Sequence, residues 1–154
     1  MGSKNLVYKK KLEEILKESF LHLKRLKDAF SELNKKYSLP LKEIDKDNIY
    51  DLALCDQIIY RFSKLQDTMG ARLFRALLLY EGEDVKRPFL DILNRLEEMN
   101  VISVDEWFEF RELRNQISHE YDFDDKIGLN IINLIYENLD EFEKILKRVE
   151  RLKE

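Results

Sequence analysis

The side chains best suited to chemistry gather within eleven residues, from 111 to 121. They are two arginines, an amide, a hydroxyl, a histidine and a phenol: Arg111, Arg114, Asn115, Ser118, His119 and Tyr121. Arginine offers a fixed cationic fork that suits phosphate, and histidine exchanges protons near neutral pH. This set suits RNA cleavage, because the ribose 2′-hydroxyl is itself the nucleophile and no metal is needed. Arg114 would stabilise charge on the phosphoryl oxygens, and Asn115 would orient the phosphate or the His119 ring.

Helix geometry limits how these side chains can meet. Arg114 and His119 are five residues apart. Because an α-helix turns about 100° per residue, they point about 140° apart on one straight helix. Ser118 and Tyr121 lie near the Arg114 stripe, whereas Asn115 shares a stripe with His119. Either the helix unwinds before His119, or two copies of the chain face each other across a dimer axis.

Two long helices are predicted ahead of this stretch. Apolar residues at steps of three and four indicate a first helix over residues 4–37 and a second over residues 49–80. Pro40 breaks the pattern between them, because proline cannot continue a helix. We expect Asp47 or Asn48 to cap the start of the second helix and Gly82 to end it.

Three further helices complete the prediction. A short one has Pro88 in its first turn and ends at Asn100. Ser103 and Glu106 spell a capping box that opens a fourth helix, which we expect to fray near His119. A last helix, capped by Asp124 or Asp125, runs to the C-terminus. The expected fold is all-α: an antiparallel up-and-down bundle of four main helices and one short one, forming a single domain over residues 1–154.

Composition supports a helical domain and excludes several classes of protein. The 154 residues suit one domain, and 44% hydrophobic residues argue against a disordered chain. Four glycines and two prolines are too few for a many-stranded sandwich. A net charge of −4 argues against nonspecific coating of DNA. Cys55 is the one cysteine, which excludes an intrachain disulfide or a multi-cysteine zinc site, so we interpret it as a packing residue.

The sequence also carries expectations about location. No apolar run approaches the length of about 18 residues that a membrane-spanning helix needs. The first sixteen residues, MGSKNLVYKKKLEEIL, lack the apolar core of a signal peptide. We therefore expect a soluble, cytoplasmic protein with no membrane partner.

The eight residues R-N-Q-I-S-H-E-Y, from Arg114 to Tyr121, resemble the R-x4-H-x-Y motif of HEPN-domain proteins. In particular, the chain is similar to HepT toxins, which are encoded beside minimal nucleotidyltransferases of the MntA type. Asn115 matches a polar residue that follows the arginine in HEPN ribonucleases. The position of the motif, near the end of the penultimate long helix of a short all-α chain, agrees with the same family.

The resemblance implies an activity and a set of partners. HEPN toxins are metal-independent endoribonucleases without a cofactor, and they act as homodimers whose two motifs line one cleft. By this resemblance Arg114 and His119 would be the catalytic pair and Asn115 would assist. A nucleotidyltransferase antitoxin would attach AMP to Tyr121, placing negative phosphate and bulk beside the RNA cleft. Because the chain is acidic overall, RNA binding would rest on local groups such as Arg111 and Arg114, with Ser118 as a further candidate.

Other interpretations remain open. The chain could be a non-catalytic HEPN subunit that binds a nucleotidyltransferase. It could also be a plain helical interaction protein in which Arg114 only forms ion pairs, with Glu109, Glu112 or Glu120. A third alternative is a Mg²⁺ or Ca²⁺ site at the acidic cluster of Glu120, Asp122, Asp124 and Asp125. Capping of the last helix explains that cluster more simply, so we predict no metal site.

Residues elsewhere bear on the same site. Asp67, Arg72 and Arg75 lie on the second predicted helix, where they could form ion pairs within the bundle. Arg72 or Arg75 could instead extend an RNA groove, and the sequence does not choose between them. Trp107 and Phe110 are expected to be core or dimer contacts rather than platforms for stacking bases.

Overall fold

The computed structural model describes the backbone of residues 3–120 and 126–154 and the side chains of residues 6–118 and 126–154. Its helices are, in chain order, α1 (Ser3–Asn34), α2 (Ile49–Thr68), the π-helical turn η1 (Met69–Leu73), α3 (Phe74–Tyr80), α4 (Phe89–Glu98), α5 (Val104–Glu120), α6 (Lys126–Glu137) and α7 (Leu139–Lys153). No strand occurs among these residues, so the expected all-α class is confirmed.

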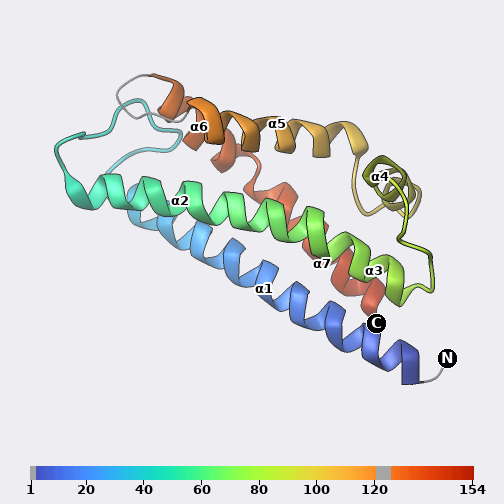
Figure 1. The fold of residues 1–154 in the computed structure, drawn as a ribbon. Helices are drawn as coiled ribbons and strands as arrows, with labels where there is room; N and C mark the ends of the chain where they lie inside the picture. Colours follow the sequence, from blue (N-terminus) through green and yellow to red (C-terminus); the bar gives the residue numbers. More distant parts are fainter. Residues whose placement is uncertain (1–2, 121–125) are drawn as a thin grey trace.

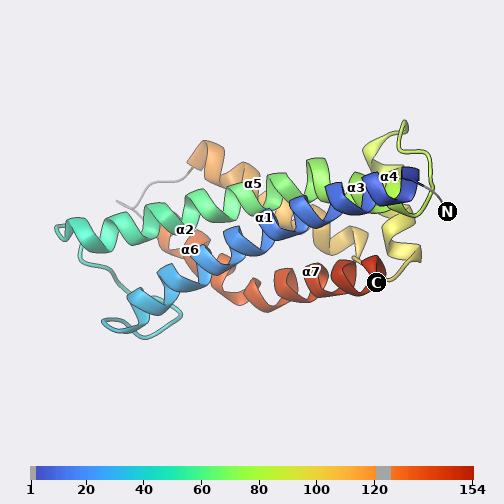
Figure 2. The same ribbon diagram turned by 90° about the horizontal axis from the view of Figure 1, so that it is seen from below.

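The helices form a bundle around the long run α2–η1–α3. α1 lies antiparallel to this run along most of its length (Figure 1). α5 packs on another side of α2, and α7 packs against α1 and α3 (Figures 1 and 2). Among the described helices, none is both long enough and apolar enough to cross a membrane.

Three of the helices differ in one respect each from the sequence prediction. The first helix ends at Asn34, three residues before the predicted end, because the chain turns there toward the 35–48 loop. The second spans residues 49–80 as predicted, but one of its turns, Met69–Leu73, is π-helical. The predicted last helix is divided at Asn138, whose ψ of 2° departs from helical geometry. The predicted caps of that helix, at residues 124 and 125, lie outside the described residues.

Local sequence signals set the other helix ends. The side-chain oxygen of Asn48 accepts a hydrogen bond of 3.0 Å from the backbone N–H of Asp51, which satisfies one free donor of the first turn of α2. Gly82 follows α3 with a φ of +82°, which glycine adopts without strain. Asn100 has a φ of +61° just after α4, where asparagine is the next most tolerant residue.

Aromatic side chains join the helices at the centre of the core. Trp107 and Phe110 of α5 are 1% and 2% exposed, so both are core residues and not platforms for bases. The Trp107 ring meets Phe74 of α3 with 4.8 Å between centroids, and the Phe110 ring meets Phe142 of α7 at 4.5 Å. Cys55 is buried as predicted, and burial raises the pKa of its thiol to about 12, which keeps it unreactive.

The loop that joins α1 to α2 is tied down at two places. The backbone N–H and C=O of Leu41 pair with the side-chain amide of Asn133 on α6, at 2.7 and 2.8 Å. The carboxylate of Asp51 accepts hydrogen bonds from the ammonium of Lys36, at 2.8 Å, and from the hydroxyl of Tyr37. These contacts hold the loop against the first turn of α2 and against α6.

Candidate functional site

α5 carries the motif and approaches the α2–η1–α3 run closely at Gly70. A Cβ placed on Gly70 would lie 3.1 Å from Cζ2 of Trp107, which is tighter than ordinary van der Waals contact. Gly70 belongs to the π turn Met69–Leu73, a distortion of the helix that is frequent near functional sites. A larger residue at position 70 would require the Trp107 ring to shift.

Arg114 is held by two neighbours on the side of α5 that faces α2. Its Nε and Nη2 each lie 3.4 Å from a different carboxylate oxygen of Asp67, and its Nη1 donates to Oγ of Ser118 at 2.7 Å. The side chains of Arg114 and Asp67 are 29% and 53% exposed. Because this ion pair is long and open to water, it orients the guanidinium but stabilises the fold by only about 0–1 kcal/mol.

A polar pocket of about 260 Å³ opens between α2 and α5, and we call it the Arg114 pocket. Its lining residues are Gln66, Asp67, Arg111, Arg114, Asn115 and Ser118. Four of the six candidate residues named from the sequence therefore line one hollow. Arg111 and Asn115 are exposed there, so a ligand can reach both.

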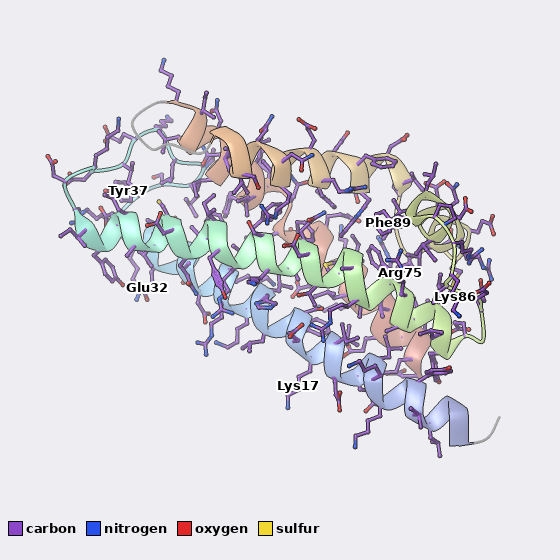
Figure 3. The ribbon with its side chains drawn as sticks, viewed as in Figure 1. Lys17, Glu32, Tyr37, Arg75, Lys86 and Phe89 are labelled. Atoms are coloured by element: carbon purple, nitrogen blue, oxygen red, sulfur yellow. The ribbon has the colours of Figure 1, made fainter. Side chains whose placement is uncertain are left out.

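A second pocket, of about 360 Å³, adjoins the first and shares Gln66, Asp67 and Arg111 with it. We call it the Phe89 pocket; its other lining residues are Gly70, Ala71, Arg75, Phe89 and Trp107. The guanidinium carbons of Arg75 and Arg111 lie 5.6 and 5.3 Å from the centroid of the Phe89 ring, within cation–π distance. Figure 3 shows Phe89 and Arg75 close together where α4 approaches α3.

The sequence did not choose between Arg72 and Arg75 as a possible extension of an RNA groove, and the structure gives the two residues different surroundings. Arg75 lines the Phe89 pocket, whereas Arg72 forms an ion pair of 2.7 Å with Glu18 on α1 and lines neither that pocket nor the Arg114 pocket. Asp67 forms the ion pair that was considered for it, with Arg114 as its partner. Among the described side chains, this aspartate from another helix pairs with Arg114, whereas Glu109 and Glu112 do not; the side chain of Glu120 lies outside the described residues.

The two remaining motif residues are described only in part or not at all. α5 is helical through Glu120, so it ends one residue after His119, close to the predicted end, and the unwinding considered before His119 does not occur. Positions 114 and 119 therefore lie about 140° apart around one helix. Position 119 falls on the stripe of Glu112 and Asn115, at the edge of the helix face that lines the Arg114 pocket. The side chain of His119 and all of Tyr121 lie outside the described residues.

The acidic cluster considered as a metal site also lies mostly outside the described residues. Of its four members, only the backbone of Glu120 is described. Within the described ranges, no group of three or more His, Cys, Asp or Glu side chains is arranged to hold a metal ion.

A carboxyl pair marks the other end of α5. Ser103 accepts a hydrogen bond of 3.3 Å from the backbone N–H of Glu106, which is half of the predicted capping box. The Glu106 carboxyl is hydrogen-bonded to Glu141 of α7, and Arg148 contacts Glu141 at 3.3 Å. Burial and the nearby Glu141 charge raise the pKa of Glu106 to about 7. The two carboxyl groups thus share a proton below that pH.

The other histidine of the chain, His22, lies at a contact between two helices. Nδ1 of His22 lies 3.1 Å from Nη1 of Arg61 at the contact between α1 and α2. Burial first, and the Arg61 charge second, lower the pKa of His22, so its neutral ring accepts the hydrogen bond from Arg61. His22 lines neither of the two pockets beside α5.

Sequence reasoning missed Gln66 and Phe89 as parts of the site. Gln66 is 6% exposed and lines both pockets, yet it belongs to no local sequence motif in α2. Phe89 is an apolar residue at the start of α4, and only its contacts with Arg75 and Arg111 reveal a further role. Comparison of the chain with models of protein families, with curated proteins and with solved structures gave no match.

Proposed function

We propose that this chain is a HEPN-type toxin that cleaves RNA without a metal ion, as a homodimer. The observation that supports the proposal most is the Arg114 pocket. Arg111, Arg114, Asn115 and Ser118 line it together, and these are the groups that would bind a phosphodiester. The short match to the R-x4-H-x-Y motif supplies the remaining residues, His119 and Tyr121.

The proposed reaction is a transesterification within the RNA strand. The ribose 2′-oxygen attacks the adjacent phosphorus, the bond to the 5′-oxygen of the next nucleotide breaks, and a 2′,3′-cyclic phosphate remains. His119 takes the proton from the 2′-hydroxyl or gives one to the leaving 5′-oxygen. Arg114 stabilises the added charge on the phosphoryl oxygens, and Asn115 positions the phosphate. All reacting groups come from RNA or from side chains, so no cofactor enters.

The phase of α5 supports the proposal of a shared cleft. Because positions 114 and 119 lie about 140° apart on an unbroken helix, one chain does not bring both to one phosphate. A two-fold axis near the exposed stripe of α5 would place Arg114 of one chain opposite His119 of the other. Exposed Glu112 and Asn115 lie on that stripe.

The proposed antitoxin is a nucleotidyltransferase that attaches AMP to Tyr121. An added phosphate beside the cleft would repel the RNA backbone, and the adenosine would block access. Intact-mass spectrometry after co-expression with a nucleotidyltransferase of the MntA type should show the mass of AMP. The Tyr121→Phe variant should lack it, and an unchanged modification in that variant would place it elsewhere.

A second candidate function rests on the contact between Arg114 and Asp67. A carboxylate already occupies part of the arginine fork, as it would in a structural ion pair. In this alternative the chain is a non-catalytic HEPN subunit or a helical partner of a nucleotidyltransferase. In that case the chain would bind its partner and would not cut RNA. Arg114 and His119 would then contribute only to folding.

One experiment separates the two candidates. Purified protein is incubated with labelled tRNA, mRNA and rRNA in EDTA, beside His119→Ala prepared in the same way, and the new ends are identified. We expect 2′,3′-cyclic phosphate ends that are lost in the variant. No cleavage by unmodified wild-type protein would favour the binding subunit. Equal cleavage in both samples would show a contaminant or a wrong site.

A further inference from the structure

The Phe89 pocket lies next to the residues that would bind the scissile phosphate, but the proposed chemistry does not use it. The Arg114 pocket and the Phe89 pocket meet at Gln66, Asp67 and Arg111. A strand bound in one pocket can therefore extend directly into the other. Its volume of about 360 Å³ exceeds that of the Arg114 pocket, and it offers room for a flat ring.

The walls of the Phe89 pocket combine apolar surface with cations. Phe89 supplies an aromatic ring, and Gly70 and Ala71 supply a low wall because their side chains are absent or small. Arg75 and Arg111 contribute two guanidinium groups near that ring. Aromatic rings beside cationic side chains are the combination with which proteins bind unpaired bases of nucleic acid strands.

Buried polar groups add recognition capacity to the same pocket. The Gln66 amide, in a side chain that is 6% exposed, lines it and offers both a donor and an acceptor. Trp107 is 1% exposed, and its Nε1 is buried with no hydrogen-bond partner among the described residues. Because Nε1 of Trp107 is covered, the Gln66 amide is the uncharged polar group that a bound base can meet in this pocket.

We infer that the Phe89 pocket is a nucleobase subsite, which holds an unpaired base of the RNA strand next to the phosphate bound at Arg114. The inference rests on the proposed function for the identity of the strand. The base stacks against Phe89 and the guanidinium planes, and Arg75 and Arg111 pair with the flanking phosphates. The substrate is therefore single-stranded RNA, because a base within a duplex is stacked and paired and does not enter the pocket.

Binding can be measured apart from cleavage. The probe is a fluorescein-labelled single-stranded RNA of mixed sequence with 2′-fluoro sugars, which resists cleavage because it lacks the 2′-hydroxyl. Fluorescence anisotropy gives its dissociation constant for wild-type protein, and a duplex of the same strand gives the comparison. We expect the single strand to bind at least about tenfold more tightly than the duplex.

Three variants and two matched controls test the pocket itself. Ala71→Leu fills the pocket from an exposed position on η1, and the same change at Ala53, an exposed position on α2 outside both pockets, is its control. Phe89→Leu keeps apolar volume but removes the aromatic face, whereas Phe89→Tyr restores it. Tyr60→Leu is the control for loss of an aromatic ring, because Arg61 and Lys64 lie over Tyr60 but it lines neither pocket.

Ala71→Leu and Phe89→Leu should each weaken binding of the single strand about tenfold, since stacking of one base is worth about 1–3 kcal/mol. Phe89→Tyr and both controls should bind as the wild type does. Equal affinity of all variants, or no binding by the wild type, would overturn the subsite.

The same samples separate the subsite from the proposed function. Cleavage of unmodified RNA by the wild type, together with unaltered binding in Ala71→Leu and Phe89→Leu, would overturn the subsite and leave the nuclease. Binding that depends on Phe89, without cleavage of any RNA, would support the subsite and overturn the nuclease.

Discussion

The first and last turns of α2 each carry an aspartate that meets a cation from another segment, and the two pairs are built differently. Asp51, in the first turn, has a side chain that is 4% exposed and contacts Lys36 at 2.8 Å. Asp67, in the last turn, is 53% exposed and contacts Arg114 at 3.4 Å. The first pair closes a loop. The second leaves its arginine reachable from a pocket that Asp67 helps to line.

Hydrogen bonding explains the difference. The Asp51 carboxylate accepts from Lys36 and from Tyr37, and these bonds hold the pKa of Asp51 below its usual range. A buried carboxylate with that many partners resists exchange with any ligand. Arg114 makes one short contact, with Ser118, and two long ones with Asp67. A phosphate could replace the long contacts with shorter ones, since charge-assisted hydrogen bonds are about 2.7–2.9 Å long.

The largest expected effect is on catalysis. Arg114→Ala should lower the rate of RNA cleavage by roughly 1,000-fold, because the phosphoryl oxygens lose their main cation. Its thermal midpoint should stay within about 2 °C of wild type, since an exposed pair contributes little stability. Cleavage of a fluorescent RNA in EDTA and scanning calorimetry measure the two quantities. A large fall in the midpoint would make Arg114 a structural residue and erase the contrast with Asp51.

Asp51→Ala should give the opposite result. The change leaves Lys36 and Tyr37 without their acceptor and should lower the thermal midpoint by roughly 10 °C. Activity per folded molecule at low temperature should be unchanged, because Asp51 lines neither pocket. Asp67→Ala is the control on the same helix and should shift the midpoint by less than about 2 °C. Equal losses for both aspartates would show that the two pairs are alike.

A smaller expected effect is on how the stability of the fold depends on pH, where the carboxyl pair of Glu106 and Glu141 differs from Asp51. The pKa of Glu106 is raised from 4.5 to about 7, so the folded state binds its proton more tightly than the unfolded state does. This contribution to stability is present below pH 4.5 and is lost as pH rises toward about 7. The lowered pKa of Asp51 acts with the opposite sign, since its contribution is lost as pH falls.

Glu106→Gln keeps a hydrogen-bond donor for Glu141 at every pH. It should raise the thermal midpoint at pH 8 by roughly 2 °C and leave it nearly unchanged at pH 4.5, a small shift because the site is partly open to water. Scanning calorimetry between these pH values gives the slope. The same difference at both pH values would mean that Glu106 carries no shared proton.

The smallest expected effect comes from removing the negative charge beside Arg114. Asp67→Asn should tighten binding of the uncleavable RNA about twofold at moderate salt, because a repulsive charge leaves the pocket. Asp28→Asn is a matched control: Asp28 is also 53% exposed and pairs with a lysine, but it lies on α1 outside both pockets. Equal gains in both variants would reflect net charge alone and would place no RNA phosphate near Asp67.

The sequence predicted those parts of the molecule that local patterns control. Helical spacing of apolar residues predicted the long run over residues 49–80. Asn48 caps its start through a side-chain hydrogen bond, and Gly82 follows its end with a positive φ. The grouping of Arg111, Arg114, Asn115 and Ser118 was also predictable, because residues three and four apart share a helix face.

Contacts between distant segments were not predictable in the same way. The pairing of Arg114 with Asp67 joins residues 47 positions apart, and nothing in either local sequence specifies it. The π turn at Met69–Leu73 and the break at Asn138 arise in stretches whose apolar spacing suits a continuous helix. The Phe89 pocket is assembled from α2, η1, α3, α4 and α5, so its existence depends on tertiary packing.

The most direct test of a shared cleft uses two inactive variants in one dimer. Arg114→Ala and His119→Ala chains, with different tags, are expressed alone and together, and metal-free RNA cleavage is measured in EDTA. If each site takes its arginine from one chain and its histidine from the other, a mixed dimer keeps one intact site. Random pairing then restores about a quarter of wild-type activity, while each variant alone stays inactive. No restoration in a purified mixed dimer would contradict the shared cleft, and with it the account of why one unbroken helix carries Arg114 and His119 on different faces.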